Sequence, residues 1–166
     1  MQDIGYLDAM VAATRKMSHG GVFLSVPGDN VMTIGWGSIG YFWGKPVFVV
    51  PVRPSRYTYG LIERADCFTV SVPLTDQLKK PLALAGSLSG RDGDKFARCG
   101  LTRKEGLYVD CPVVQECQLH FECVVRLRQD MTSDRMDAQV LKGAYPSGDL
   151  HRMFFGEILG CYRTDL

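Results

Sequence analysis

The sequence lacks an excess of either charge. Nineteen lysines and arginines oppose eighteen aspartates and glutamates, which gives a formal net charge of +1 at pH 7 over 166 residues. Nucleic acids and membrane surfaces attract proteins through a surplus of basic residues, and this chain has no such surplus. We therefore expect neither a nucleic acid nor a membrane among its partners.

The six cysteines lack the spacing of zinc knuckles and of redox-active motifs, because no two are separated by only two residues. A six-residue spacing separates Cys111, Cys117 and Cys123. On an extended strand that spacing is roughly 20 Å between neighbours, too far for one metal or one disulfide. The three histidines also lie outside any metal-ligand spacing. We predict no metal site, and cysteines that are buried or reduced thiols.

Long hydrophobic runs are also missing. The longest strongly apolar stretch is about 47–52, far short of the roughly 20 residues that a membrane-spanning helix needs. Asp3 and Asp8 stand where a secretory signal has basic residues and then an apolar block. We therefore expect a cytoplasmic protein, and the length favours one domain over residues 1–166.

The hydrophobic pattern predicts an N-terminal helix followed by short strands. Apolar residues at helical spacing predict a helix over 3–17, ended by the glycines at 20 and 21. The clearest strand, 118–128, alternates apolar and polar residues as a half-buried antiparallel strand does. The other expected elements are strands at 21–26, 30–36, 46–52, 67–72, 138–141 and 152–161, and short helices at 58–64, 77–84 and 93–98.

Many strands and few helices favour a mainly β fold, a closed barrel decorated by helices. Glycine accounts for 18 of the 166 residues, more than the ordinary share of about 7 %, as many tight turns require. We expect the N-terminal helix within 1–17 and the barrel over 21–161.

The stretch 30–62 contains no aspartate or glutamate, although it carries Lys45, Arg53 and Arg56. A segment cleared of negative charge suits an anionic ligand. Its apolar strand leads into a loop and then into an expected helix start, where free backbone N–H groups favour phosphate. Arginine adds a planar fork that matches phosphate oxygens. The alternative is an arginine-rich surface turn.

Two hydroxyl residues follow in the same loop. Ser55 and Thr58 can either cap the helix or donate to a phosphate. The preceding segment, 30–37, combines polar side chains with tryptophan and glycine, and glycine permits the close approach of a backbone to a flat ring. Core packing is the alternative use of Trp36 and Trp43.

The order and spacing of several motifs resemble the flavin reductase-like family, and its flavoredoxin branch in particular. The matching stretches are 30–33 (NVMT), 44–46 (GKP), 52–58 (VRPSRYT), 67–73 (CFTVSVP), 89–96 (SGRDGDKF), 116–124 (ECQLHFECV) and 155–158 (FGEI). The similarity extends over roughly residues 21–161. It implies an FMN-binding split β-barrel, usually a homodimer with the flavin near the subunit interface.

The resemblance also implies a set of cofactor-binding residues. The phosphate and ribityl end would be held by Arg53, Ser55, Arg56 and Thr58. The residues lying along the flavin would be Asn30, Met32, Thr33 and Trp36. Backbone groups would be presented to the ring by Val50, Pro51 and Val52. The site would be closed by Gly90 and Lys95, from the same or the partner subunit, with a solvated helix position as the alternative for Lys95.

One family feature is altered near the C-terminal end. Related reductases often carry an adjacent Gly-Asp-His, where the histidine is associated with nicotinamide use. This chain reads Gly148-Asp149-Leu150-His151, with one residue inserted. On a strand, a one-residue shift turns a side chain to the other face. We therefore expect an exposed loop histidine, with contact to a nicotinamide as the alternative for His151.

By this resemblance the chain is an FMN-binding flavoprotein of electron transfer, an NAD(P)H-dependent flavin reductase or a flavoredoxin-like protein. FMN is the expected cofactor, and NADH or NADPH the candidate electron donor. The alternatives are an FMN-binding electron carrier or flavin-storage module without nicotinamide turnover, and a barrel that has lost flavin. No Ser-His-Asp or Cys-His pairing indicates nucleophilic catalysis by a side chain. The expected partners are a second copy, as a homodimer, and a redox protein.

Overall fold

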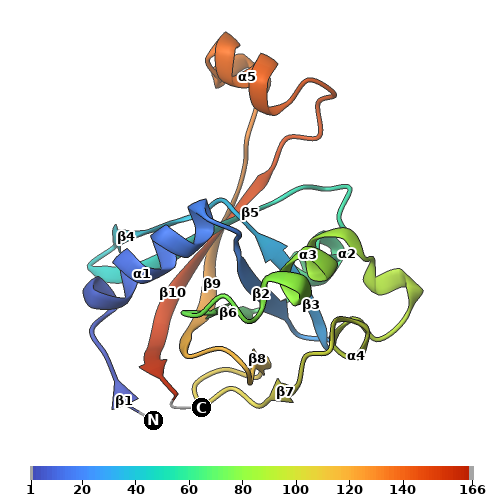
Figure 1. The fold of residues 1–166 in the computed structure, drawn as a ribbon. Coiled ribbons are helices and arrows are strands. Elements are labelled where there is room, and N and C mark those ends of the chain that lie inside the picture. Colours follow the sequence, from blue (N-terminus) through green and yellow to red (C-terminus); the bar gives the residue numbers. More distant parts are fainter. Residues whose placement is uncertain (1, 165–166) are drawn as a thin grey trace.

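Antiparallel strands organise residues 2–164, the part of the chain that this computed structural model describes (Figure 1). One sheet has the strand order β3-β2-β6-β9-β10-β5-β4, and β1 pairs with β10. Its strands are β1 (Gln2–Asp3), β2 (Val22–Val26), β3 (Asn30–Ile34), β4 (Ser38–Phe42), β5 (Lys45–Val52), β6 (Cys67–Val72), β9 (Leu119–Asp130) and β10 (Arg152–Arg163). The short strands β7 (Arg103–Lys104) and β8 (Val113–Val114) pair with each other.

The mainly β class is confirmed, but full closure of the barrel is not found. The hydrogen-bonded order within residues 2–164 runs from β3 to β4 without returning. Two register shifts between β9 and β10, next to Gly156 and Gly160, bend the central strands. A side chain at either glycine would collide with the ring of Phe68 or Tyr108. The sheet therefore coils around its core while its two outer strands stay unpaired with each other.

The helices decorate this sheet. They are α1 (Tyr6–Ser18), α2 (Tyr57–Ile62), α3 (Lys79–Ser87), α4 (Lys95–Cys99) and α5 (Ala138–Ala144), with short 3-10 turns at Gly90–Asp92 and Ser133–Arg135. The first helix begins later than expected, because Gly5 is extended and residues 2–3 pair with β10 instead. No helix in the described range is both long and apolar enough to span a membrane.

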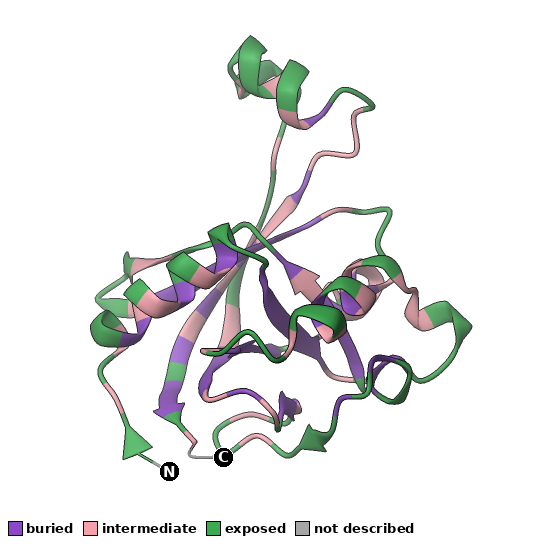
Figure 2. Cartoon of the chain, in the orientation of Figure 1, coloured by how far each residue is buried: buried purple, intermediate pink, exposed green. Residues whose placement is uncertain are grey.

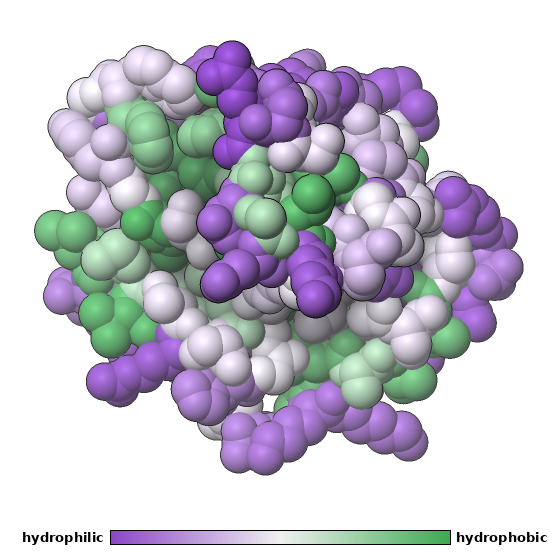
Figure 3. Space-filling view, turned by 90° about the horizontal axis from the view of Figure 1, so that it is seen from above, coloured by the Kyte–Doolittle hydropathy of each residue, from purple (hydrophilic) through white to green (hydrophobic). Residues whose placement is uncertain are grey.

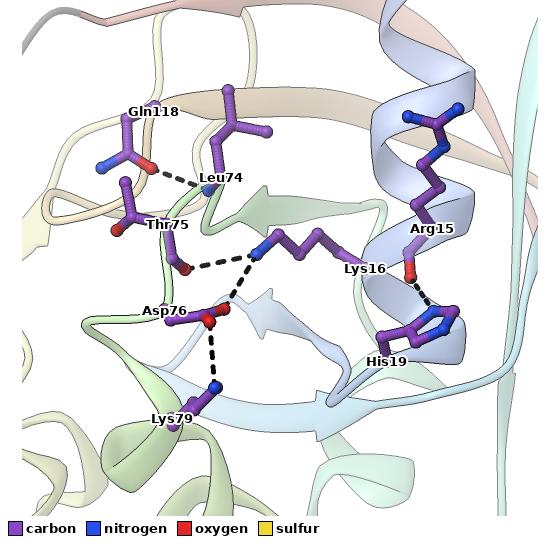
Figure 4. Close-up of polar contacts among 8 residues, drawn as sticks. All are labelled: Arg15, Lys16, His19, Leu74, Thr75, Asp76, Lys79 and Gln118. Atoms are coloured by element: carbon purple, nitrogen blue, oxygen red, sulfur yellow. Dashed lines mark hydrogen bonds and ion pairs between the residues drawn. The ribbon is translucent and has the colours of Figure 1, made fainter.

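Helix α1 is anchored to the loop after β6 at its C-terminal end (Figure 4). The Lys16 ammonium reaches the carbonyl oxygen of Thr75 at 3.3 Å and the Asp76 carboxylate at 3.5 Å. The same carboxylate accepts Lys79 at 2.9 Å, so one acidic group links α1 to α3. Exposed ion pairs stabilise little, about 0.2–1 kcal/mol each, and the buried face of α1 is the stronger anchor.

The strand expected at 138–141 is wrong, because these residues form the first turn of α5. The Asp137 carboxylate accepts the backbone N–H groups of Gln139 and Val140 at 2.8 and 3.2 Å, which is an N-cap. The strands β1, β4, β7 and β8 were not predicted. All but β4 are two residues long, and β4 is mostly exposed, so none carries a strong apolar alternation.

The half-buried alternation expected for 118–128 is wrong, because β9 is buried on both faces at its start and Leu127 is exposed near its end. Both faces of its first five residues are buried, including His120 and Glu122. The Glu122 carboxylate accepts the N–H groups of Leu107, Tyr108 and Val109 and the Tyr162 hydroxyl, at 2.6–3.0 Å. A loop therefore covers the polar face, which is satisfied by hydrogen bonds rather than by water.

The apolar core lies between the sheet and its helices, as the buried central strands in Figure 2 show. A larger cluster contains the rings of Phe48, Phe68, Phe121 and Phe154, and Ala9 and Ala13 of α1. A second cluster joins Phe23 and Phe96 beneath α3 and α4. The expectation of buried, reduced cysteines is confirmed, because all six are free and buried.

Residues 131–151 form a segment that we call the arm. It connects β9 to β10, carries α5 and projects away from the sheet (Figure 1). No residue of α5 is buried, and the helix is drawn almost wholly as exposed in Figure 2. Seen from above, hydrophobic and hydrophilic residues are interspersed over this face of the molecule (Figure 3). The base of the arm returns to the sheet beside the end of β5, where Arg152 pairs with Val52.

Candidate functional site

Two neighbouring cavities open where β3, the end of β5 and the base of the arm meet. The first, which we call the tryptophan cavity, has a volume of about 170 Å³. It is lined by Met32, Thr33, Ile34, Gly35, Trp36, Pro51, Arg53, Arg56 and His151. The second, the lysine cavity, has about 100 Å³. It is lined by Met32, Ser55, Arg56, Tyr57, Thr58, Ala85, Gly86, Ser87, Leu88, Ser89, Gly90, Arg91 and Lys95.

Met32 and Arg56 line both cavities, so the two spaces adjoin. Each is smaller than the roughly 300–1,000 Å³ of a typical ligand site, and a ligand of that size has to occupy both. The Arg56 side chain is exposed and donates one long hydrogen bond, 3.4 Å to the carbonyl oxygen of Gly86. This residue can therefore change its conformation at little cost and turn toward a ligand that bridges the cavities.

The tryptophan cavity has an aromatic wall. The Trp36 ring lies 5.2 Å from the His151 ring and 6.3 Å from the Tyr145 ring, between centroids. Core packing, the alternative for the tryptophans, is wrong: Trp36 is 51 % exposed and Trp43 is 57 % exposed. Trp36 lies just beyond the last residue of β3, so its ring is not enclosed by the sheet. An exposed ring beside a cavity offers a flat apolar surface to a ligand.

The expected exposed position of His151 is wrong, because this residue is buried beside the cavity, with 8 % of its surface exposed. Its Nδ1 atom shares a hydrogen bond of 2.7 Å with the Tyr145 hydroxyl. Burial, reinforced by the charges of Arg53 and Arg56, lowers the pKa of His151 to about 4. The imidazole is therefore neutral at pH 7.

Arg53 holds the arm. Its guanidinium donates to the carbonyl oxygens of Asp149 and Ala144, both at 3.0 Å. It also lies 4.9 Å from the Tyr145 ring centroid and 6.0 Å from that of Trp36, within the range of cation–π attraction. The sequence predicted a phosphate ligand here. In this structure the donors of Arg53 point to the arm, although the residue still lines the tryptophan cavity.

The helix-cap role considered for the hydroxyl residues is wrong. The N-cap of α2 is Arg56, and no side chain caps this helix. The Ser55 hydroxyl donates to the Asp149 carboxylate at 2.6 Å, and the Ser55 N–H donates to the same carboxylate at 3.2 Å. Thr58 instead accepts the side-chain amide of Asn30 at 2.7 Å. Ser55 and Thr58 both line the lysine cavity.

Lys95 is buried at the other side of the lysine cavity, with 5 % of its surface exposed. The alternative of a solvated helix position is therefore wrong, because Lys95 is buried although it is the first residue of α4. Burial lowers the pKa of Lys95 to about 8, and the charges of Arg56 and Arg98 act in the same direction. Within residues 2–164 its ammonium makes no hydrogen bond or ion pair. An anion bound in this cavity would stabilise the charged form and raise the pKa of Lys95.

Gly90 is placed where no side chain fits. A Cβ atom there would lie 2.6 Å from the Tyr57 ring and would also collide with the side-chain oxygen of Asn30. That oxygen is buried and has no hydrogen-bond partner in the described part of the chain. The lysine cavity is thus lined by a buried cation, and an unpartnered buried oxygen lies against Gly90 in its wall, polar surroundings that favour a polar ligand.

The remaining predicted residues divide between the cavities and the core. Pro51 and Thr33 line the tryptophan cavity, and Thr33 donates to the carbonyl oxygen of Leu82 at 2.6 Å. The side chains of Val50 and Val52 are buried in the larger core cluster. The contribution of the β5 backbone to a bound ring stays a prediction.

Sequence reasoning missed the contribution of the arm. Tyr145 supports His151 and Arg53, and Asp149 occupies both donors of Ser55. The dipeptide Gly148-Asp149 reads as a turn, and both residues adopt a positive φ, +80° and +49°. That local pattern does not show where the turn docks. Ser87 and Ser89, which also line the lysine cavity, were not predicted as site residues, although Ser89 begins the matched stretch 89–96. Within residues 2–164 no cluster of potential metal ligands occurs.

Comparison with known proteins places this chain in a family. The sequence profile described as flavin reductase like domain matches residues 12–165. The chain therefore belongs to the flavin reductase-like family, and its fold is the split β-barrel of these proteins. This membership supports a flavin-related redox function.

Individual relatives agree with this assignment. An uncharacterised protein of Archaeoglobus fulgidus is 34 % identical over 130 residues, which cover 78 % of this chain and 63 % of that protein. The chain thus spans less than two thirds of this relative's length. The flavoredoxin of Desulfovibrio vulgaris is 26 % identical with a TM-score of 0.68, covering 87 % of this chain and 69 % of that one. Flavoredoxin from Methanosarcina acetivorans is 25 % identical with a TM-score of 0.69, at the same coverage.

Proposed function

We propose that this protein binds FMN and acts in electron transfer as an NAD(P)H-dependent flavin reductase. One observation carries the proposal: a cavity beside an exposed tryptophan ring adjoins a cavity with a buried lysine, and Arg56 lines both. FMN has the matching chemistry, a flat ring at one end and a phosphate at the other. Two relatives in solved structures carry the name flavoredoxin, which supports the same choice.

The residues present fit this cofactor. Lys95 and Arg56 would hold the phosphate, since a buried ammonium without an internal partner gains most from an anion. Gly90 preserves the wall of that cavity, because any side chain there would collide with the Tyr57 ring and the Asn30 side chain. Trp36, Met32 and Pro51 would supply the flat, mostly apolar walls for the ring. Bound FMN would supply the redox chemistry, accepting electrons from a nicotinamide and passing them on.

The protein's own residues bind and orient. The neutral His151 adds no charge to the tryptophan cavity at pH 7, and its ring is fixed by Tyr145. Arg53 places a positive charge at the edge of the same cavity while it secures the arm. With FMN bound, the positive charge of Arg53 would stabilise the more negative, reduced form of the ring.

The test has two stages. Purified protein is first titrated with FMN, and we expect saturable binding and a yellow protein. NADH and NADPH are then added separately under anaerobic conditions while the flavin spectrum is followed, and steady-state oxidation is measured with excess FMN. Reduction by one nicotinamide with turnover is the expected result. A colourless protein that does not bind added FMN would contradict the proposal.

A second candidate is an FMN-binding electron carrier without nicotinamide turnover. It is favoured by the position of His151, whose ring is tied to Tyr145 and packed beside Trp36 rather than free to meet a nicotinamide. This candidate predicts bound FMN that neither NADH nor NADPH reduces but that a redox protein does reduce.

The homodimer is a further proposal, and it rests on the resemblance to the family. Light scattering after size-exclusion chromatography should give twice the 18.5 kDa mass of one chain. A mass of one chain, with FMN bound, would show that a single subunit completes the site.

A further inference from the structure

The loop predicted to grip a phosphate already holds an anion of the protein itself. The Asp149 carboxylate accepts the Ser55 hydroxyl at 2.6 Å through one oxygen and the Ser55 backbone N–H at 3.2 Å through the other. These two contacts use both donors of Ser55. A carboxylate that spans a hydroxyl and a backbone N–H takes the same kind of donors that a phosphate takes.

The position of this carboxylate is held by the arm. Gly148 and Asp149 form a turn with φ values of +80° and +49°, and the second is a conformation that residues other than glycine rarely adopt. Arg53 secures the same turn by donating to the carbonyl oxygens of Asp149 and Ala144. The structure therefore maintains an uncommon backbone conformation, with Asp149 directed at Ser55.

The carboxylate lies next to a cavity that is otherwise basic. Ser55 lines the lysine cavity together with Arg56, Arg91 and Lys95. No aspartate or glutamate belongs to that lining, so Asp149 is the negative charge that meets this site through Ser55. A phosphate bound at Ser55 would have to displace the carboxylate, because two anions cannot share the same donors and repel each other at contact distance.

We propose that Asp149 is a specificity-determining residue that competes with the phosphate of FMN for Ser55. This inference rests on the proposed binding of FMN. Asp149 lowers the affinity for a phosphorylated flavin relative to a flavin without phosphate. Riboflavin has no phosphate to bind Ser55, so its affinity is not lowered by Asp149. Phosphate binding at Ser55 also breaks the contact between Ser55 and Asp149 of the arm, whereas the hydrogen bonds from Arg53 to the arm remain.

The experiment compares FMN with riboflavin on the full chain. Dissociation constants are measured by flavin fluorescence for the wild type, for Asp149→Asn and for Asp149→Gly, which both tolerate the positive φ. Asp134→Asn is the control, because it removes one negative charge from an exposed position of the same arm. We expect the Asp149 variants to bind FMN about tenfold more tightly with riboflavin changed less than twofold, and the control to match the wild type.

Two results would overturn the inference. If both Asp149 variants bind FMN as the wild type does, or more weakly, the carboxylate does not compete with phosphate. If FMN and riboflavin change by the same factor, Asp149 acts on the whole cavity rather than on the phosphate. Failure of the proposed function is a different outcome, in which the wild type, the control and both variants bind neither flavin.

Discussion

The lysine cavity and the tryptophan cavity share Met32 and Arg56, but they are built from different parts of the molecule. The lysine cavity is enclosed by α2, α3 and the turn before α4, which pack on the sheet. The wall of the tryptophan cavity includes His151, which lies at the base of the arm and is hydrogen-bonded to Tyr145. The cations differ in the same way: Arg53 is bonded to arm carbonyls, whereas Lys95 makes no internal ion pair in the described residues.

This difference separates two tasks. A cavity enclosed by packed elements, with a cation already desolvated, is organised before its ligand arrives and loses little entropy on binding. A cavity whose wall belongs to a projecting segment depends on the few contacts that hold the segment in place. We therefore expect the Lys95 side of the phosphate end to be preformed, whereas the Ser55 side, which Asp149 occupies, and the ring end should vary with the arm.

The largest expected effect comes from closing the lysine cavity. Gly90→Ala places a methyl group against the Tyr57 ring and the Asn30 side chain. The overpacking is relieved if the Tyr57 ring moves into the cavity that it lines. FMN binding then has to reverse this movement at a cost of up to about 3 kcal/mol, or about a hundredfold in affinity. Titration of FMN into the folded variant measures it. The control is Gly143→Ala, at a position where a Cβ atom meets nothing within 4 Å. Equal binding by both variants would show that the ligand does not enter this cavity.

Removal of the residue that joins the cavities should have the next largest effect. Arg56→Ala should weaken FMN binding by about 1.5–3 kcal/mol, the usual worth of a charge-assisted hydrogen bond, while the unfolding transition stays in place because the side chain is exposed. Isothermal titration gives the affinity. Arg135→Ala, on the exposed face of the arm, removes the same charge and should leave the affinity unchanged. An unaltered affinity in Arg56→Ala would remove this residue from the site.

Lys95 provides a pH test that belongs to the lysine cavity alone. Its pKa of about 8 in the free protein means that it loses its charge as the pH rises from 7 to 9, whereas a phosphate monoester is already fully ionised there. FMN affinity should fall over this interval by up to about tenfold per pH unit above 8, and riboflavin affinity should not. Lys95→Met should abolish the dependence, and Lys80→Met, an exposed position, should retain it. A flat FMN profile in the wild type would contradict the assignment.

The last prediction tests the tryptophan cavity through stability rather than through affinity. Burial lowers the pKa values of His151 and His120 to about 4, so the unfolded chain binds protons first as the pH falls below about 6.5. The free energy of unfolding should therefore fall between pH 6.5 and 5, by up to about 1.4 kcal/mol per pH unit for each histidine. Urea denaturation at several pH values gives the dependence of the free energy of unfolding on pH. This dependence should be shallower for His151→Asn and unchanged for His19→Asn, an exposed position. Equal slopes in both variants would place His151 in water.

The fold followed from the sequence where local patterns agreed with tertiary packing. Six of the expected strands are present, since apolar runs between glycine and proline reflect both local preference and burial. The half-buried reading of β9 failed at His120 and Glu122, because a covering loop buried polar side chains that their alternation placed in water. The expected strand at 138–141 failed because Asp137 caps a helix there.

The candidate site also has one part that local patterns predict and one part that depends on tertiary contacts. The loop with Arg53, Ser55 and Arg56 could be found from its missing carboxylates and its motif. The docking of the arm could not, because it depends on contacts more than 90 residues apart along the chain, such as Arg53 to Ala144 and Ser55 to Asp149. The rule that a one-residue shift on a strand reverses the side chain does not apply to His151, because this residue precedes β10. Its hydrogen bond with Tyr145 fixes its position instead.

Glu122 carries a consequence for which residues can stand at its position. Each of its two oxygens accepts two hydrogen bonds: Oε1 from Leu107 and Tyr162, Oε2 from Tyr108 and Val109. Every lone pair of the carboxylate is therefore used, and every neighbour is a donor. Glutamine, the same size and uncharged, would replace one of these oxygens by an NH2 group that faces at least one backbone N–H group. The four donors around position 122 therefore favour glutamate over glutamine.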